Sequence, residues 1–272
     1  MKIGIFDSGV GGLIIARAIR KKMPEYDYVY LGDTKRVPYG SRSHETVYQF
    51  TRECIDFLLR KENCALVIVA CNTASARALR RIQREYLPKK FPNRKVIGVL
   101  IPAAEEAAKF RKIGILATVG TVASKTFPAE IKKINRNAQI FQNAAPMLVP
   151  LAEAGENPST GSGQAKQAKS FLAGYLGPLI AKKPEALVLG CTHYPIFKSE
   201  IKKLLPKKVK IISQDEIIPA KLKNYLKSHP EISKKLSQGG SAKILVTDIT
   251  PNVKELSRKW FGKVKPKLIF LS

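Results

Sequence analysis

Short apolar runs alternate along the chain with segments of helical periodicity. In the first hundred residues, the runs Ile3–Phe6, Tyr28–Leu31, Leu66–Val69 and Val96–Leu100 are rich in β-branched and aromatic residues, which predicts four strands. The segments between them, such as His44–Lys61, repeat their apolar residues at helical spacing. Strands that alternate with helices predict an α/β fold, in which a mainly parallel sheet is flanked by helices.

Three segments of the first half have counterparts, in the same order, in the second half. The pairs are residues 2–12 with 112–122, the segment around Cys71 with that around Cys191, and residues 96–104 with 209–222. Such a repeat indicates a duplicated α/β unit. We therefore predict two pseudo-symmetric domains, residues 1–98 with 214–272 and residues 99–213. Apolar runs at 244–246 and 268–271 are expected to complete the first domain, and polar residues 156–164 to form a mobile surface loop.

Two cysteines follow equivalent apolar runs. Cys71 comes after Leu66–Val69 and Ala70, Cys191 comes after Leu187–Leu189 and Gly190, and hydrogen-bonding residues follow each cysteine at once. If the two halves pack face to face, equivalent strand ends should point into a shared cleft and the two thiols should flank one bound molecule.

Two thiols on opposite faces of a carbon can invert its stereochemistry, because one removes a proton while the other returns one from behind. A free cysteine has a pKa of about 8.5, which neighbouring groups can lower. Helix N-termini predicted directly after Cys71 and Cys191 would favour the thiolate, and Asp7 and His193 are available as helpers.

Other uses of these residues stay open. Cys191 and His193 could belong to a metal site, although closing a zinc site needs two further ligands and the chain has no C-x-x-C or H-x-x-x-H spacing. Cys191 could act as a covalent nucleophile with His193 as base, or both cysteines could be core residues. Cys54 and Cys64 are predicted to be core residues.

A glycine turn follows the first predicted strand. Asp7-Ser8-Gly9-Val10-Gly11-Gly12 links a strand to a helix, an arrangement that presents backbone N–H groups to an anion. A dinucleotide-binding fingerprint would need glycine at Ile14, so that motif fails. Asp7 is either a functional acid or a capping residue.

Composition adds constraints on location and partners. Lysine and arginine exceed the acidic residues by 27, which would attract anions, and both a solvated basic surface and a nucleic-acid footprint stay open. Four cysteines without close pairs favour a reduced, cytoplasmic protein. The first residues run straight into a strand pattern and no apolar run reaches the length of a membrane span, so we expect no signal peptide and no membrane association.

The motifs taken together resemble the glutamate racemases of the aspartate/glutamate racemase superfamily. The residues that carry the resemblance are Asp7 to Gly12, Gly32-Asp33-Thr34, Val37-Pro38-Tyr39-Gly40, Ala70 to Ala74, Val149 to Glu153, and Gly190 to Pro195. The resemblance implies two pseudo-symmetric α/β domains with the active site in the cleft between them. It also implies a cofactor-independent and metal-free isomerase that interconverts L- and D-glutamate and supplies D-glutamate for peptidoglycan.

The resemblance also implies residue roles. Cys71 would exchange the α-proton of D-glutamate with help from Asp7, and Cys191 that of L-glutamate with help from His193 and Glu153. The implied substrate contacts are hydroxyl, amide and backbone groups at Ser8, Tyr39, Gly40, Asn72, Thr73, Thr118, Thr121 and Thr192.

Two positions depart from the family pattern. Ala154 stands where a second acid is usual, and Ala145 where a cysteine is common.

The resemblance also bears on partners and substrate. A homodimer is expected, and a contact with DNA gyrase stays open as a separate binding role. A racemase that acts on aspartate or another amino acid is a third possibility.

Overall fold

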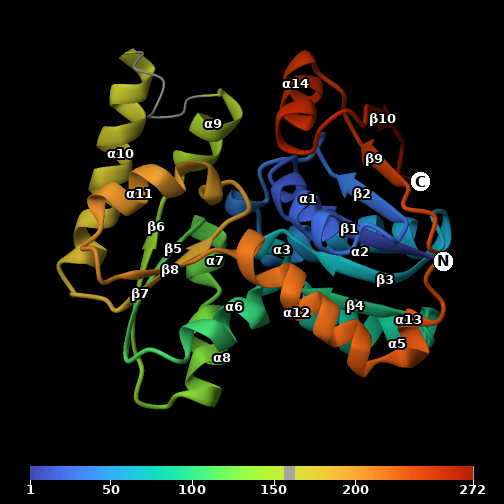
Figure 1. Ribbon diagram of the computed structural model, residues 1–272, viewed down its shortest axis with the longest axis horizontal. Coiled ribbons are helices and arrows are strands. Elements are labelled where there is room, and N and C mark those ends of the chain that lie inside the picture. Colours follow the sequence, from blue (N-terminus) through green and yellow to red (C-terminus); the bar gives the residue numbers. More distant parts are fainter. Residues whose placement is uncertain (156–162, 272) are drawn as a thin grey trace. The chain divides into compact units, whose positions relative to one another are not determined.

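The computed structural model describes residues 1–155 and 163–271 (Figure 1). The chain divides into two compact units, one made of Met1–Val99 and Asp215–Ser272 and the other of Leu100–Gln214. The polar loop expected at 156–164 lies outside the described residues except for its last two positions, which begin helix α10.

Unit 1 is built on a six-stranded, entirely parallel sheet with the strand order β10-β9-β2-β1-β3-β4. Its strands are β1 (Lys2–Asp7), β2 (Tyr28–Gly32), β3 (Cys64–Val69), β4 (Lys95–Gly98), β9 (Ala242–Val246) and β10 (Pro266–Leu268). The four strands expected in the first hundred residues are confirmed. So is the return of the C-terminal segment to this sheet, where β9 pairs with β2 and β10 with β9, although β10 ends at Leu268.

Unit 2 is built on a four-stranded parallel sheet with the order β6-β5-β7-β8. Its strands are β5 (Lys112–Ala117), β6 (Gln139–Ala144), β7 (Ala186–Gly190) and β8 (Lys210–Ile212). This order matches β2-β1-β3-β4 strand for strand, so the predicted duplication is confirmed at the level of topology. Each cysteine strand, β3 or β7, lies beside the first strand of its unit.

The helices of unit 1 connect its parallel strands. They are α1 (Gly12–Lys22), η1 (Tyr39–Ser41), α2 (His44–Arg60), α3 (Asn72–Arg77), α4 (Leu79–Arg81), the π-helical turn η2 (Ile82–Tyr86), α5 (Leu87–Lys90), α12 (Gln214–Ser228), α13 (Pro230–Ser233) and α14 (Pro251–Trp260). After Cys71 the helical segment begins at Asn72 and widens into a π turn before Pro88, whose missing N–H cannot bond the carbonyl four residues earlier.

The helices of unit 2 are α6 (Leu100–Ala107), α7 (Val119–Ala123), α8 (Thr126–Ile134), α9 (Leu148–Glu153), α10 (Gly163–Ile180), η4 (Tyr194–Phe197) and α11 (Lys198–Leu204). The strand expected at Val96–Leu100 ends earlier, at Gly98, and Leu100 already belongs to α6.

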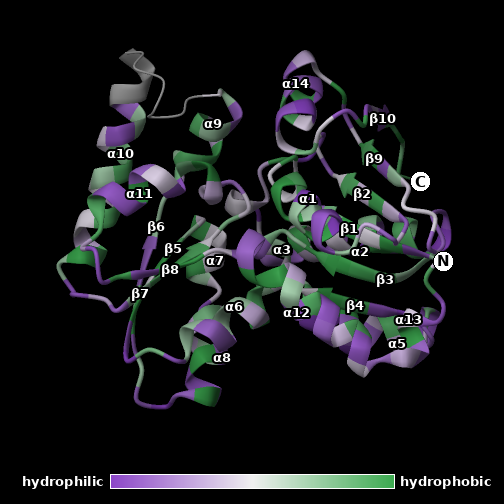
Figure 2. Ribbon diagram, viewed as in Figure 1, coloured by the Kyte–Doolittle hydropathy of each residue, from purple (hydrophilic) through white to green (hydrophobic). Residues whose placement is uncertain are grey.

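Each unit has its own hydrophobic core, and the strands carry much of it (Figure 2). Every residue of β3 and of β7 is buried, as expected for strands covered on both faces. Cys54 and Cys64 are fully buried in the core of unit 1, which confirms their prediction as core residues. Among the described residues, no helix has the length and apolar character needed to cross a membrane.

Candidate active site

Cys71 lies at the carboxyl end of β3, where it caps the N-terminus of α3. Its Sγ accepts a hydrogen bond from the Ala74 backbone N–H (3.4 Å), and the thiol donates to Ser8 Oγ (3.4 Å). The side chain is 5% exposed. The helix start predicted directly after this cysteine is confirmed.

Asp7 ends β1 at the same edge of the sheet. Ala70, which directly precedes Cys71, donates its N–H to the Phe6 carbonyl (2.8 Å), so the ends of β1 and β3 lie side by side. The fully buried Asp7 carboxylate accepts from the Gly9 N–H (3.1 Å) and thereby shapes the glycine turn. A Cβ at Gly12 would lie 2.6 Å from Asp7 Cβ, so only glycine fits there.

The other expected contact residues of unit 1 cluster around the same helix start. Asn72 and Thr73 form the buried first turn of α3, and η1, which contains Gly40, packs against α3. Tyr39, also named among the implied contacts, has a buried side chain. Its ring is 1% exposed and packs between Phe6 and Phe50 in the core, because the phenol has a buried hydrogen-bond acceptor. Gly40, the next residue, is partly exposed.

Cys191 lies at the equivalent position of unit 2, directly after β7, and is 6% exposed. Its Sγ lies 3.8 Å from His193 Nδ1, and His193 Nε2 lies 2.9 Å from Glu153 Oε1 at the end of α9. The structure thus brings together Cys191, His193 and Glu153, as the sequence analysis expected.

The pKa of His193 is strongly shifted in this cluster. Burial lowers its pKa, but hydrogen bonds to Cys191 and Glu153 and the negative charges of both outweigh burial and raise the pKa to about 10. A protonated imidazole beside Cys191 stabilises a thiolate there. The buried Thr192 lies alongside, with its hydroxyl 3.5 Å from His193 Nδ1.

A helix directly after Cys191 was expected, and the structure contradicts it. Thr192 and His193 form a turn, and the next element is the short 3₁₀ helix η4. Pro195 in its first turn lacks an N–H, and the Tyr194 hydroxyl donates to the Ala145 carbonyl (2.9 Å), which anchors the segment in this shape. At Cys191 an imidazole, and not a helix N-terminus, lies beside the sulfur.

Thr118 and Thr121 lie after β5, which corresponds to β1. Thr118 caps α7, with its Oγ1 accepting from the Thr121 N–H (3.3 Å) and lying 3.0 Å from Thr121 Oγ1. Ala117 pairs with Gly190 in the sheet, so these hydroxyls belong to the strand next to Cys191. Ala117 occupies the place that Asp7 has in unit 1, and the two cysteine environments are therefore chemically different.

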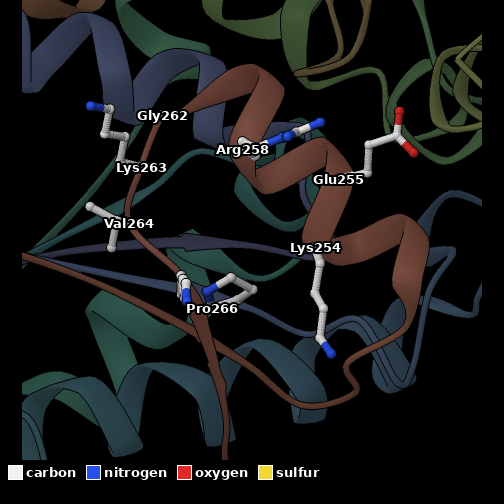
Figure 3. A pocket seen from close by; sticks show the side chains of 8 residues that line it. Lys254, Glu255, Arg258, Gly262, Lys263, Val264 and Pro266 are labelled. Carbon is white, nitrogen blue, oxygen red and sulfur yellow. The ribbon is translucent and has the colours of Figure 1, made fainter.

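A hollow of about 680 Å³ in unit 1 is separate from these residues. It lies between α14 and the segment 262–266, and Lys254, Arg258 and Lys263 are among its lining residues. In Figure 3 these three side chains point in different directions, and the Glu255 carboxylate turns away from the 262–266 segment. This hollow therefore does not present a convergent binding set. Within the described part of the chain, no three His, Cys, Asp or Glu residues are grouped as metal ligands.

Comparison with known sequences gives one family. The model of the Asp/Glu/Hydantoin racemase family matches residues 14–217. A glutamate racemase of Aquifex pyrophilus is 39% identical over 98% of this chain and 96% of its own length. One from Sulfurihydrogenibium is 38% identical over the whole of this chain and 98% of its own length.

Solved structures give the same result. The glutamate racemase of Francisella tularensis, crystallised with D-glutamate, superposes with a TM-score of 0.87 at 29% identity and covers 99% of this chain and 97% of its own. The Escherichia coli glutamate racemase, in complex with L-glutamate and the activator UDP-MurNAc-Ala, has a TM-score of 0.77 at 26% identity and covers 99% of both chains.

Proposed function

The chain belongs to the Asp/Glu/hydantoin racemase family, and we propose that it interconverts L- and D-glutamate without a cofactor by proton transfer through Cys71 and Cys191. The observation that carries this proposal is the pair of cysteines at equivalent strand ends in two units of the same topology, each with its own polar partners. If Cys191 were a lone nucleophile, or if both cysteines were core residues, the equivalent positions of the two thiols would have no explanation.

The proposed reaction has two half-steps. A thiolate takes the α-proton of glutamate and leaves a planar carbanion, and the thiol on the opposite face gives its proton to the same carbon. Cys71 acts as base towards D-glutamate and as acid when D-glutamate forms, and Cys191 has the converse roles for L-glutamate. The mechanism requires both sulfurs to reach one α-carbon from opposite sides.

The two thiols have different helpers in this proposal. Asp7, one strand away from Cys71, serves that thiol, while the Ala74 N–H favours its thiolate. His193, oriented by Glu153, serves Cys191 and exchanges a proton with its sulfur. Inversion needs no symmetry between the faces, because each face has only to hold a thiol that can both lose and regain a proton.

Hydroxyl, amide and backbone groups around both strand ends are proposed to bind the substrate carboxylates and ammonium. In unit 1 these are Ser8, Gly40 with the backbone of Tyr39, Asn72 and Thr73, and in unit 2 they are Thr118, Thr121 and Thr192. The proximity of Ser8 Oγ to Cys71 Sγ supports its place in this set.

We further propose that the product D-glutamate enters peptidoglycan in the cytoplasm, as the resemblance to bacterial glutamate racemases suggests, and that the enzyme is a homodimer. A separate contact with DNA gyrase, and nucleic-acid binding through the excess of basic charge, stay predictions.

Racemisation in D₂O tests the proposed activity. The purified protein, dialysed against a metal chelator and with no added pyridoxal phosphate, should incorporate deuterium at the α-carbon of either glutamate enantiomer and form the other one. Proton NMR reports the exchange and polarimetry the inversion. An enzyme that acts only after pyridoxal phosphate or a metal is added would contradict cofactor independence, and one that acts on aspartate but not glutamate would contradict the substrate.

A further inference from the structure

Asp33 is a fully buried carboxylate at the end of β2 with three side-chain hydrogen-bond donors around it. It accepts from the Tyr39 hydroxyl (2.5 Å), from Arg36 Nε (2.6 Å) and from the Thr247 hydroxyl (2.8 Å). A buried carboxylate is stable only when its oxygens are satisfied in this way. Asp33 therefore links the loop that carries Arg36 and Tyr39 to Thr247, which is distant in the sequence.

The charge at this position is balanced inside the same cluster. Arg36 pairs with Asp33 and with Glu53, stacks its guanidinium 4.1 Å above the Phe50 ring, and directs Nη2 at Cys54 Sγ (3.5 Å). Burial raises the pKa of Tyr39, and the nearby Cys54 and Asp33 raise it further, so its phenol stays a donor. The cluster is a fixed network with one arginine between two carboxylates.

The network also connects the 33–41 loop to the C-terminal part of the chain. The Thr247 hydroxyl accepts from the Lys35 N–H (3.0 Å) while it donates to Asp33, and the Thr247 N–H donates to the Gly32 carbonyl (3.1 Å). Beside it, the Thr34 hydroxyl donates to the Asp248 carbonyl and accepts from the Asp248 N–H. Residues just after β9 thus hold the loop that follows β2.

The same network reaches the candidate active site. The Asp33 N–H donates to the Asp7 carbonyl (3.1 Å), and η1, which begins at Tyr39, packs against α3, whose N-terminus Cys71 caps. A shift of the 33–41 loop would therefore move the Gly40 backbone relative to Cys71 and Ser8.

We propose that Asp33 is a positioning residue of the enzyme, and that its carboxylate, held by Thr247 and Arg36 and bonded to Tyr39, fixes the Gly40 backbone at the place where it binds glutamate. The inference rests on the proposed function, because it takes Gly40 as a substrate contact. Asp33 itself acts through the loop and exchanges no proton with substrate.

Thr247→Val tests this inference, since valine has nearly the shape of threonine but removes the hydroxyl that donates to Asp33 Oδ1 and accepts from the Lys35 N–H. Thr51→Val is the matched control: Thr51 is fully buried on α2, and its hydroxyl is without a hydrogen-bond partner among the described residues. Thr247→Ser keeps the hydroxyl and serves as the conservative rescue.

The readouts are the dissociation constants of both glutamate enantiomers by calorimetry, KM and kcat by polarimetry, and the melting temperature. We expect Thr247→Val to weaken glutamate binding and raise KM roughly tenfold, with a much smaller change in kcat, as the loss of one or two hydrogen bonds allows. Thr247→Ser and Thr51→Val should stay within about twofold of the wild type.

A Thr247→Val protein that melts at a lower temperature but binds glutamate like Thr51→Val would overturn the inference, because Asp33 would then have a structural role alone. If Thr247→Val does not fold, Tyr39→Phe removes a single donor to Asp33, and unchanged glutamate binding by that variant would overturn it equally. If the wild type binds glutamate but does not exchange its α-proton for deuterium, the proposed chemistry is refuted, and the binding constants of the variants still decide whether Asp33 positions the loop. If the wild type does not bind glutamate, the proposed chemistry and the positioning role of Asp33 are both refuted.

Discussion

The four cysteines differ in what surrounds the thiol. Burial raises the pKa of Cys54 and Cys64, to about 12 for Cys64, so both are inert hydrophobic residues. Cys71 instead has a backbone N–H directed at its sulfur, and Cys191 has an imidazole. The cysteines thus have two kinds of environment, and Cys71 and Cys191, at strand ends, are the two suited to proton transfer.

His193→Gln should remove a pH-dependent part of the stability. The folded-state pKa of about 10 exceeds the ordinary value of 6.5, so the protonated imidazole stabilises the fold fully below pH 6.5, and this contribution is lost as the pH rises towards 10. Urea unfolding of the wild type and of His193→Gln should therefore give a difference that shrinks between pH 6.5 and 10. His44→Gln, at an exposed position, is the control. A difference that is constant across this interval would contradict a protonated His193.

At the residue scale, the sequence was sufficient to place the two thiols and their acidic and basic neighbours, because these residues follow recognisable strands. It could not show that the Tyr39 ring is buried. That outcome depends on Asp33, which in turn is held by Thr247, more than two hundred positions away in the chain. Long-range hydrogen bonds of this kind leave no local pattern, although Asp33, a charged residue directly after a buried strand, is itself a sequence signal.

At the level of elements, equivalent strand ends are built from different small residues. Ala70, the first residue after β3, precedes Cys71, whereas Gly190, the last residue of β7, precedes Cys191. A Cβ at Gly190 would lie 2.9 Å from Ala117 Cβ and 3.2 Å from the Phe127 ring, so β7 can approach β5 only with glycine there. The glycine sets how closely the end of β7, and with it Cys191, lies against its neighbour.

Gly190→Ala should therefore displace Cys191 and destabilise unit 2. We expect a loss of about 1 to 3 kcal/mol in the free energy of unfolding, as for other overpacked sites, and a fall in kcat. Gly174→Ala is a suitable control, because a Cβ there meets no atom within 4 Å. Unfolding in urea measures the first effect and polarimetry the second. Wild-type stability and turnover in Gly190→Ala would show that the close approach of β5 and β7 does not matter.

The elements also show where a sequence pattern is insufficient. The repeat predicted a duplicated α/β unit, which the matching strand orders confirm. The half-buried strand β6 was not recognised, since its Gln139, Gln142 and Asn143 dilute the apolar pattern. The helix expected after Cys191 is a turn, because Pro195 and the Tyr194 hydrogen bond override the analogy with Cys71. Equivalent positions in a duplicated fold therefore need not keep equivalent local structure.

On the scale of the whole molecule, the excess of 27 positive charges is the most unusual property of the chain. Salt bridges neutralise part of it locally, for example Arg81 with Glu45 and Glu85. The remaining positive field should raise the local concentration of an anionic substrate such as glutamate.

KM for glutamate should therefore rise with ionic strength. Between about 0.02 and 0.3 M salt, where the Debye length falls from about 20 to about 6 Å, we expect KM to increase a few-fold while kcat changes little. Potassium chloride and potassium acetate should give the same curve. A KM that is independent of salt would show that the basic surface has no part in substrate capture, and an effect of one anion alone would indicate competition at the site.

The central claim is that inversion needs one thiol from each unit, and deuterium exchange by single-cysteine variants tests it most directly. In D₂O, the wild type should exchange the α-proton of both glutamate enantiomers and interconvert them. Cys71→Ala should at most exchange the α-proton of L-glutamate, and Cys191→Ala at most that of D-glutamate, with no inversion by either variant, because a carbanion formed on one face then has no acid on the other. Cys64→Ala, which removes a core thiol away from the Asp33 network, is the control for the loss of a cysteine as such. Inversion of glutamate by either Cys71→Ala or Cys191→Ala would contradict the two-thiol mechanism.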